Sequence, residues 1–107
     1  MDNLELICFR IITAVGTARS LFIEAIQEAK NGDFIKAKEL IEEGDKCFVE
    51  GHKAHAQLIQ REASGDTINV SLLLLHAEDQ LMSADGFKTI AEEMIELHKL
   101  ISKIGGK

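Results

Sequence analysis

The chain has 107 residues, of which 46% are hydrophobic and 28% are charged, and it contains no proline, tryptophan or tyrosine. This length suits one hydrophobic core, so we expect a single domain over residues 1–107 and exclude a second. The lack of proline favours long helices over a sandwich of many turn-linked strands. A formal net charge of −6 at pH 7 opposes binding to the phosphates of nucleic acid or of an anionic membrane.

The first residues lack the basic and apolar regions of a secretory signal, and the longest apolar run, 68–76, is interrupted by Asn69 and Ser71. We therefore expect a cytoplasmic protein without membrane insertion. Cys8 and Cys47 have neither the CxxC spacing of a metal or redox site nor the density of a disulfide scaffold. Both are predicted to be packed thiols inside helices.

Two glycine-containing stretches, 31–33 and 64–66, divide the chain into three segments. Each glycine is a helix stop signal followed by candidate N-cap residues, which are Asp33 after the first and Asp66, Thr67 and Asn69 after the second. The segments are roughly 30 to 36 residues long, which corresponds to helices of about 45 to 55 Å. The turns between them allow only antiparallel neighbours, so we predict an all-α fold, an antiparallel three-helix bundle.

Apolar residues recur at alternating steps of three and four in each segment, which is the spacing of a helical seam. The first stripe comprises Leu4, Cys8, Ile11, Val15, Ala18, Phe22, Ala25 and Ala29. The second, weakened by two glycines and a histidine, comprises Phe34, Ala37, Ile41, Gly44, Phe48, Gly51, His55 and Leu58, widened by Leu40, Cys47 and Ile59. The third comprises Leu72, Leu75, Asp79 and Met82, and after a slip it resumes with Ile90, Met94, Leu97, Ile101 and Ile104.

Four consecutive leucines at 72–75 cover every side of one helical turn in the third segment. A helix that is apolar all round must be buried all round, and a three-helix chain cannot surround its own third helix. The simplest solution is self-association with the third helices innermost, under closed cyclic symmetry. The sequence therefore predicts a homo-oligomer.

Asp79 lies in the middle of the third stripe. A buried carboxylate must be protonated, paired with a cation, or placed where identical copies share a metal ion. In a rotationally symmetric oligomer one copy from each chain meets at the axis, where carboxylate oxygens suit a hard cation such as magnesium. The alternative is that the helix turns Asp79 outward into solvent, and the spacing alone does not choose between them.

His76 precedes Asp79 by three residues, so the two are neighbours on a helix, with His76 at the edge of the stripe. A neutral imidazole there would offer a nucleophilic nitrogen, although a structural role stays open for a lone helical histidine. His52 and His55 lie one turn apart and could form half of a metal site, but no third ligand is identifiable, and a packing role is favoured for His55. His98 is expected to be solvated. The chain has no glycine-rich phosphate loop or serine elbow.

The stretch 72–82, LLLLHAEDQLM, resembles the signature of the enzyme IIA component of the bacterial phosphotransferase system for lactose, cellobiose and chitooligosaccharides. The resemblance extends over nearly the whole chain, in order and with matching lengths. It includes Gly16-Thr17-Ala18-Arg19-Ser20, Gly32-Asp33-Phe34 with Ala37, and the run LIQREASG at 58–65.

This resemblance implies a homotrimer, a nine-helix bundle that works as a phosphoryl carrier. His76 matches the phosphoryl-accepting histidine, linked through its Nε2, and Asp79 matches the aspartate that holds one Mg²⁺ per trimer. The carrier protein HPr would be the donor and a cysteine of the cognate enzyme IIB the acceptor, in the uptake of a β-linked disaccharide or a similar sugar. The alternative is a non-catalytic trimeric interaction or regulatory module with the same fold.

Three departures from the family pattern affect the surroundings of the site. The family usually has glutamine in place of Glu78, histidine in place of Gln80, and Ala-His-x-x-Gln-Thr where this chain has residues 51–56. Glu78 adds negative charge two residues from an imidazole that must take up a phosphoryl group. The reactive histidine and the metal-binding aspartate are both retained, so the relay chemistry is still expected.

Overall fold

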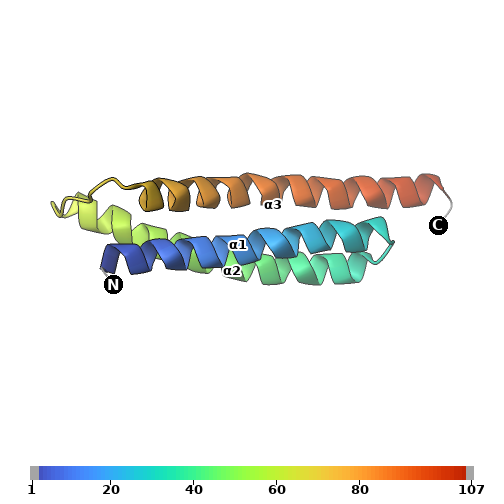
Figure 1. Ribbon diagram of the computed structural model, residues 1–107. Helices are drawn as coiled ribbons and strands as arrows, with labels where there is room; N and C mark the ends of the chain where they lie inside the picture. The colour runs from blue at the N-terminus through green and yellow to red at the C-terminus, as the bar shows by residue number, and fades with distance from the viewer. Residues whose placement is uncertain (1–2, 106–107) are drawn as a thin grey trace.

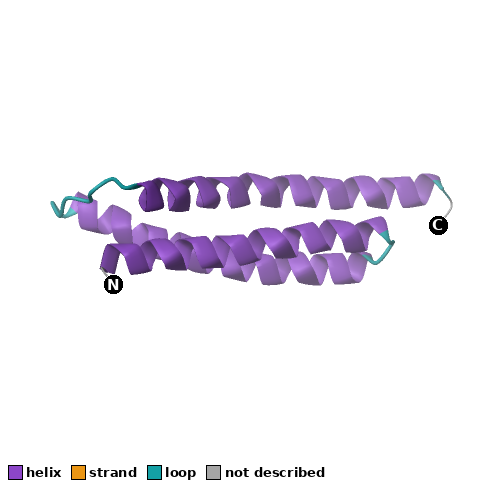
Figure 2. Ribbon diagram, viewed as in Figure 1, coloured by secondary structure: helices purple, strands orange, loops and turns teal. Residues whose placement is uncertain are grey.

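The computed structural model describes residues 3–105, which form three helices joined by two connections (Figure 1, Figure 2). α1 spans Asn3–Lys30, α2 spans Phe34–Ala63 and α3 spans Leu72–Ile104. Successive helices run in opposite directions along a rod with extents of 59 × 21 × 20 Å. The prediction of an all-α antiparallel three-helix bundle is confirmed.

The turn between α1 and α2 follows the predicted capping chemistry. Gly32 has a φ of 86°, a left-handed conformation that glycine adopts without the clash that a Cβ would cause. The carboxylate of Asp33 then accepts a hydrogen bond from the backbone N–H of Lys36 at 3.0 Å, which satisfies one of the free N–H groups at the start of α2. A single short turn therefore reverses the chain.

The second connection is longer than the sequence predicted. Gly65 ends α2 with a φ of 94°, but none of the candidates Asp66, Thr67 and Asn69 caps a helix. The N-cap of α3 is Ser71, whose hydroxyl accepts the backbone N–H of Leu74 at 3.1 Å. The side chain of Asp66 instead lies 3.5 Å from Nε of Arg61, so it stabilises the end of α2, and the chain is non-helical up to Ser71.

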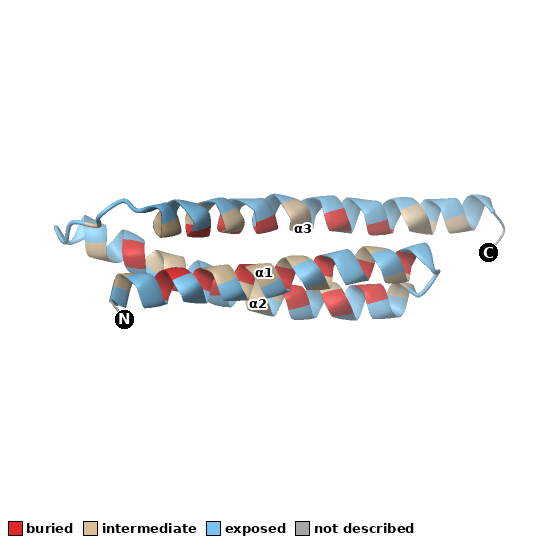
Figure 3. Cartoon of the chain, viewed as in Figure 1, coloured by how far each residue is buried: buried red, intermediate tan, exposed pale blue. Residues whose placement is uncertain are grey.

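The stripe predicted for the first segment is the side of α1 that faces both other helices (Figure 3). Every predicted member is buried except Leu4, which is half-buried. Phe22 and Ile11 are completely inaccessible. The heptad spacing therefore identified the core side of this helix correctly, because α1 lies between two neighbours and uses one continuous face for both.

The two glycines of the second stripe are points of close helix contact. A methyl group at Gly44 would lie 2.6 Å from Cε1 of Phe22, and one at Gly51 would lie 2.6 Å from Cγ1 of Val15. These glycines therefore let α2 approach α1 more closely than alanine would permit, so they support the packing that they were expected to weaken. Ile59, which was expected to widen this stripe, is 56% exposed, and that prediction was wrong.

α3 has two apolar faces on nearly opposite sides. Its inward face packs against the other helices through Ala77, Leu81, Ala84, Ala91 and Ile95. Its outward face consists of the stripe predicted from the sequence, and every member is exposed within the single chain: Leu72, Leu75, Asp79, Met82, Ile90, Met94, Leu97, Ile101 and Ile104. Leu72 is 84% exposed and Met82 is 72% exposed. An apolar face of this length without cover in its own chain is consistent with the predicted homo-oligomer, which stays a prediction.

α1 is the one described helix that is long and apolar enough to cross a membrane by length and composition, with a mean hydropathy of 1.7 over its best window. A core helix of a bundle passes the same test. The buried residues of α1 contact α2 and α3, as expected for a helix in a bundle core.

Candidate functional site

His76 lies in the second turn of α3, just after the Ser71 cap that fixes where the helix begins. Its side chain is exposed, and no hydrogen bond or ion pair engages its ring within the described residues 3–105. An imidazole without a partner keeps a nitrogen lone pair available to an incoming electrophile. The structure thus leaves the predicted reactive histidine free on the surface.

Asp79 follows His76 by one turn and lies on the outward face of α3, between Leu75 and Met82. Within one chain its carboxylate is exposed, and the described residues contain no group of three His, Cys, Asp or Glu side chains that could hold a metal ion. A single carboxylate does not form a cation site. A metal at Asp79 would therefore need further ligands from other copies of the chain.

Glu78 contacts His55 across the α2–α3 boundary, an interaction that the sequence reasoning did not anticipate. His55 Nε2 lies 2.6 Å from Glu78 Oε1, and the two side chains are 16% and 43% exposed. With an ionised carboxylate, this distance requires the proton to lie on Nε2 of the imidazole. Residues two apart differ by about 200° around a helix, so Glu78 and His76 lie on opposite flanks of α3.

This contact explains how the chain accommodates an acidic residue two positions from His76, the predicted reactive histidine. The carboxylate of Glu78 is directed to α2, while His76 faces away from it, so most of the helix lies between the two groups. His55, for which a packing role was favoured, is half-buried and joins α2 to α3 through its hydrogen bond with Glu78. The signal in the sequence was the joint presence of His55 and Glu78 in place of the two family glutamines.

Cys8 lies in the core, where burial raises the pKa of its thiol above 9.0, and the negative charges of Glu78 and then Glu5 raise it further. The thiol is therefore protonated and inert at neutral pH, as predicted for a packed cysteine. Cys47 is half-buried and packs against the core cluster that contains Phe22, so both thiols lie packed inside helices as predicted, with Cys47 the more accessible of the two.

The two remaining histidines do not complete a site. His52 is exposed, and its ring centroid lies 6.2 Å from that of Phe48. No third ligand joins His52 and His55 within residues 3–105, and His55 is engaged by Glu78. His98 is half-buried near the end of α3, and it is therefore less solvated than expected.

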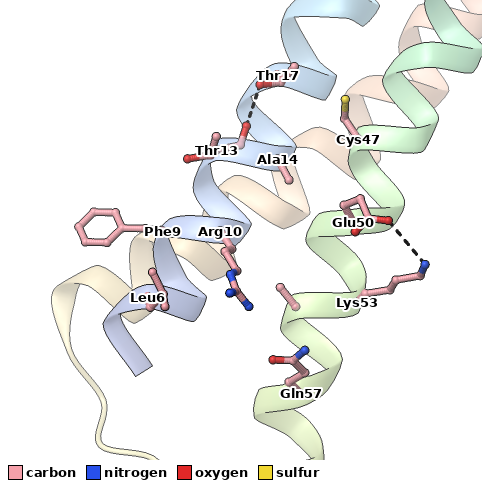
Figure 4. Close-up of a pocket in the computed structure, with 11 residues that line it drawn as sticks. Leu6, Phe9, Arg10, Thr13, Ala14, Thr17, Cys47, Glu50, Lys53 and Gln57 are labelled. Carbon is pink, nitrogen blue, oxygen red and sulfur yellow. Dashed lines mark hydrogen bonds and ion pairs between the residues drawn. The ribbon is translucent and has the colours of Figure 1, made fainter. Parts of the chain in front are cut away.

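A groove of about 670 Å³ runs between α1 and α2 (Figure 4). Leu6 and Phe9 of α1 and Gln57 of α2 are among its lining residues, and Lys53 pairs with Glu50 at its edge. Neither His76 nor Asp79 lines it. The groove and His76 are therefore separate features of the surface.

The sequence matches the family model for the lactose/cellobiose-specific IIA subunit of the phosphotransferase system over residues 6–99. The lactose-specific EIIA component from Staphylococcus aureus is 40% identical over 98 residues, which cover 92% of this chain and 95% of that protein. The corresponding component from Streptococcus mutans is 39% identical, covering 92% of this chain and 94% of that protein.

Solved structures agree with this. The cellobiose-specific enzyme IIA from Bacillus anthracis superposes with a TM-score of 0.94 at 39% identity, covering 96% of this chain and 94% of that one. IIA(Chitobiose) in its complex with HPr, from the Escherichia coli N,N'-diacetylchitobiose branch, gives 0.82 at 33% identity, covering 95% and 99%. The chain belongs to the lactose/cellobiose-specific IIA family of the sugar phosphotransferase system.

Proposed function

We propose that this chain is a phosphoryl carrier in which His76 accepts a phosphoryl group from phospho-HPr and passes it to a cysteine of the cognate enzyme IIB. The observation that carries the proposal is the exposed ring of His76, which has no partner within the described residues, in a chain of this family. A structure of a relative in complex with HPr supports HPr as the donor. The system would take up a β-linked disaccharide or a similar sugar.

The first transfer exchanges one N–P bond for another. The Nε2 lone pair of neutral His76 attacks the phosphorus of phospho-HPr in line, and the bond from phosphorus to the HPr histidine breaks with its electron pair returning to that ring. In the second transfer a cysteine thiolate of IIB attacks the same phosphorus, an S–P bond forms, and the electron pair of the N–P bond returns to Nε2. Both steps depend on alignment and charge more than on acid or base groups.

Two carboxylates lie close to His76 in the sequence, those of Glu78 and Asp79. A phosphoryl group brings two negative charges, and a free carboxylate beside the imidazole would oppose its arrival. The nearest acidic neighbour in sequence, Glu78, is bound to His55 at 2.6 Å on the far flank of α3. Glu78 therefore adds little opposing charge at His76, and the negative charge of Asp79, one turn further along α3, is the one that the Mg²⁺ proposed below would offset.

We further propose a homotrimer with a nine-helix bundle, in which the outward faces of three α3 helices meet. This arrangement would cover the exposed leucines, isoleucines and methionines of that face. It would also bring three copies of Asp79 to the axis, where Mg²⁺ fits because carboxylate oxygens are its preferred ligands. A bound cation would neutralise the three carboxylates.

The proposed carrier works in the cytoplasm as a soluble partner of HPr and IIB, without contact with nucleic acid and without insertion into a membrane. The sugar would be recognised by the membrane component that IIB serves.

The test is a phosphorylation assay. Purified chain is incubated with enzyme I, HPr and phosphoenolpyruvate, and its intact mass is measured before and after addition of IIB. We expect the mass of one phosphate to appear on the wild type and to disappear when IIB is added, and we expect no label on His76→Ala. The His52→Ala variant is the matched control and should be labelled normally.

Label on His76→Ala would contradict the assignment of the site. A wild type that takes no label from phospho-HPr would favour the alternative, a non-catalytic trimeric interaction module.

A further inference from the structure

Arg19 of α1 is a half-buried cation without a carboxylate partner. Three other basic residues of the described chain are half-buried, and each binds a carboxylate; the pairs are Arg61–Asp66, Lys88–Asp45 and Lys99–Glu96. Arg19 instead donates from Nη1 to the hydroxyl of Ser83 at 3.2 Å, and no ion pair engages it within residues 3–105. In a chain with 18 acidic residues, this points to a counter-charge on another molecule.

Two sets of contacts define the flanks that border the outward face of α3. The flank toward α1 carries Ser83, where Arg19 binds. The flank toward α2 carries Glu78, which binds His55. We call these the α1-side flank and the α2-side flank. Both border the apolar stripe, because Ser83 directly follows Met82 and Glu78 directly precedes Asp79.

The α2-side flank carries an unpaired acid at the level of Arg19. Asp85 lies two residues after Ser83, which places it about 3 Å further along the axis and about 200° around the helix. It is exposed, and within the described residues it has no hydrogen bond or ion pair. Arg19 and Asp85 thus place opposite charges at the two flanks, and neither forms a close ion pair within residues 3–105, although the charge of Asp85 also acts on Lys88 of its own helix.

Cyclic symmetry brings these flanks together. When parallel copies of α3 meet along their outward faces, each chain presents its α1-side flank to one neighbour and its α2-side flank to the other. In coiled coils the positions that border the apolar seam form ion pairs between helices and set the orientation of the partners. We propose that Arg19 binds Asp85 of the neighbouring copy at each of the three interfaces. This inference rests on the trimer proposed above.

The test is a charge-reversal cycle of Arg19→Glu, Asp85→Lys and the double variant, measured by sedimentation equilibrium at low salt. Each single variant places like charges at three interfaces, so the midpoint concentration of trimer dissociation should rise about tenfold or more. The double variant restores opposite charges and should return to within about threefold of the wild type. Higher salt should reduce all of these differences.

Arg10→Glu is the matched control, because it makes the same charge change on α1 at an exposed residue that lines the α1–α2 groove. We expect it to leave the midpoint unchanged. The neutral cycle Arg19→Gln and Asp85→Asn provides a milder perturbation: each single should weaken the trimer, and combining them should add no further loss.

Three outcomes would overturn the inference alone while leaving the trimer in place. These are single reversals that leave the midpoint unchanged, a double variant as weak as both singles combined, or an equal loss with Arg10→Glu. A wild type that is monomeric at every concentration would overturn the proposed trimer and this inference together. Phosphorylation of His76 is measured in a separate assay. A result against the phosphoryl-carrier function is therefore distinguishable from a result against the Arg19–Asp85 ion pair.

Discussion

Gly44 of α2 lies against the ring of Phe22 of α1, so that a methyl group at position 44 would stand 2.6 Å from Cε1 and 3.2 Å from the carbonyl oxygen of Ala18. Phe22 is completely buried, so its ring or the neighbouring backbone would have to shift to admit the methyl group. Gly44→Ala should therefore lower the free energy of unfolding by about 1–3 kcal/mol despite the better helix propensity of alanine. Urea unfolding at a fixed protein concentration measures it.

Gly16→Ala serves as the control for this substitution, since a methyl group there meets nothing within 4 Å in the chain. It should stabilise the protein by about 0.5–1 kcal/mol through helix propensity alone. Equal effects of the two substitutions would show that the helices do not approach as closely as described.

Asp79→Leu should preserve or strengthen the proposed trimer and remove its dependence on divalent cations. Leucine continues the apolar outward face, and replacement of a buried charge cluster by packed apolar groups is often neutral or stabilising. Thermal unfolding with and without EDTA, together with sedimentation equilibrium, measures both effects. Glu42→Leu, at an exposed carboxylate of α2, should leave the response to EDTA intact. A monomeric Asp79→Leu variant would mean that the aspartate organises assembly.

The Lys88–Asp45 pair ties α3 to α2 with Nζ and Oδ1 2.6 Å apart. The hydrogen bond to Asp45 raises the pKa of Lys88 above 10.5, against the opposing effect of burial. A raised pKa means that the charged amine stabilises the fold fully below about pH 10.5 and that this contribution is lost as the pH rises through the folded-state pKa.

Lys88→Met should accordingly lower the free energy of unfolding by about 0.5–1 kcal/mol at neutral pH. At alkaline pH, where Lys88 loses its charge, the variant and the wild type should have the same free energy of unfolding. Urea titrations across this pH range measure it. Lys46→Met, at an exposed lysine of α2, should have almost no effect at either pH. If the variant is still less stable than the wild type once Lys88 is neutral, the lost stability comes from the packing of the lysine side chain and not from its charge.

The two cysteines should differ in reactivity toward iodoacetamide in the native state. Cys8 is buried, with a raised pKa, whereas Cys47 is half-buried and lines the α1–α2 groove. Alkylation requires the thiolate and access to it. Peptide mapping after brief alkylation at pH 8 should find label on Cys47 first, with Cys8 modified only after unfolding. Faster labelling of Cys8 in the native protein would contradict the packing described for α1.

Much of this protein follows from periodicity and from residue chemistry along the chain. The heptad steps of the first segment identify the core face of α1, because a helix between two neighbours buries one continuous stripe. Gly32 and Gly65 mark the helix ends, because only glycine adopts their backbone conformation without strain. The apolar stretch around His76 and Asp79 made both residues candidates, since a charged or titratable group within such a stripe is unusual, and their roles stay predictions.

Tertiary structure decided what depends on the rotation and register of one helix against another. The inward face of α3 consists mainly of alanines, whose weak hydrophobic signal is hidden beside the larger residues of the outward stripe. The Glu78–His55 contact joins residues 23 positions apart, and the periodicity of each helix does not specify which residue of a neighbour it will meet. The close contact at Gly44 could not be predicted from the sequence either. Glycine has no side chain to contribute to the hydrophobic pattern, so its role becomes visible only when α1 packs against it.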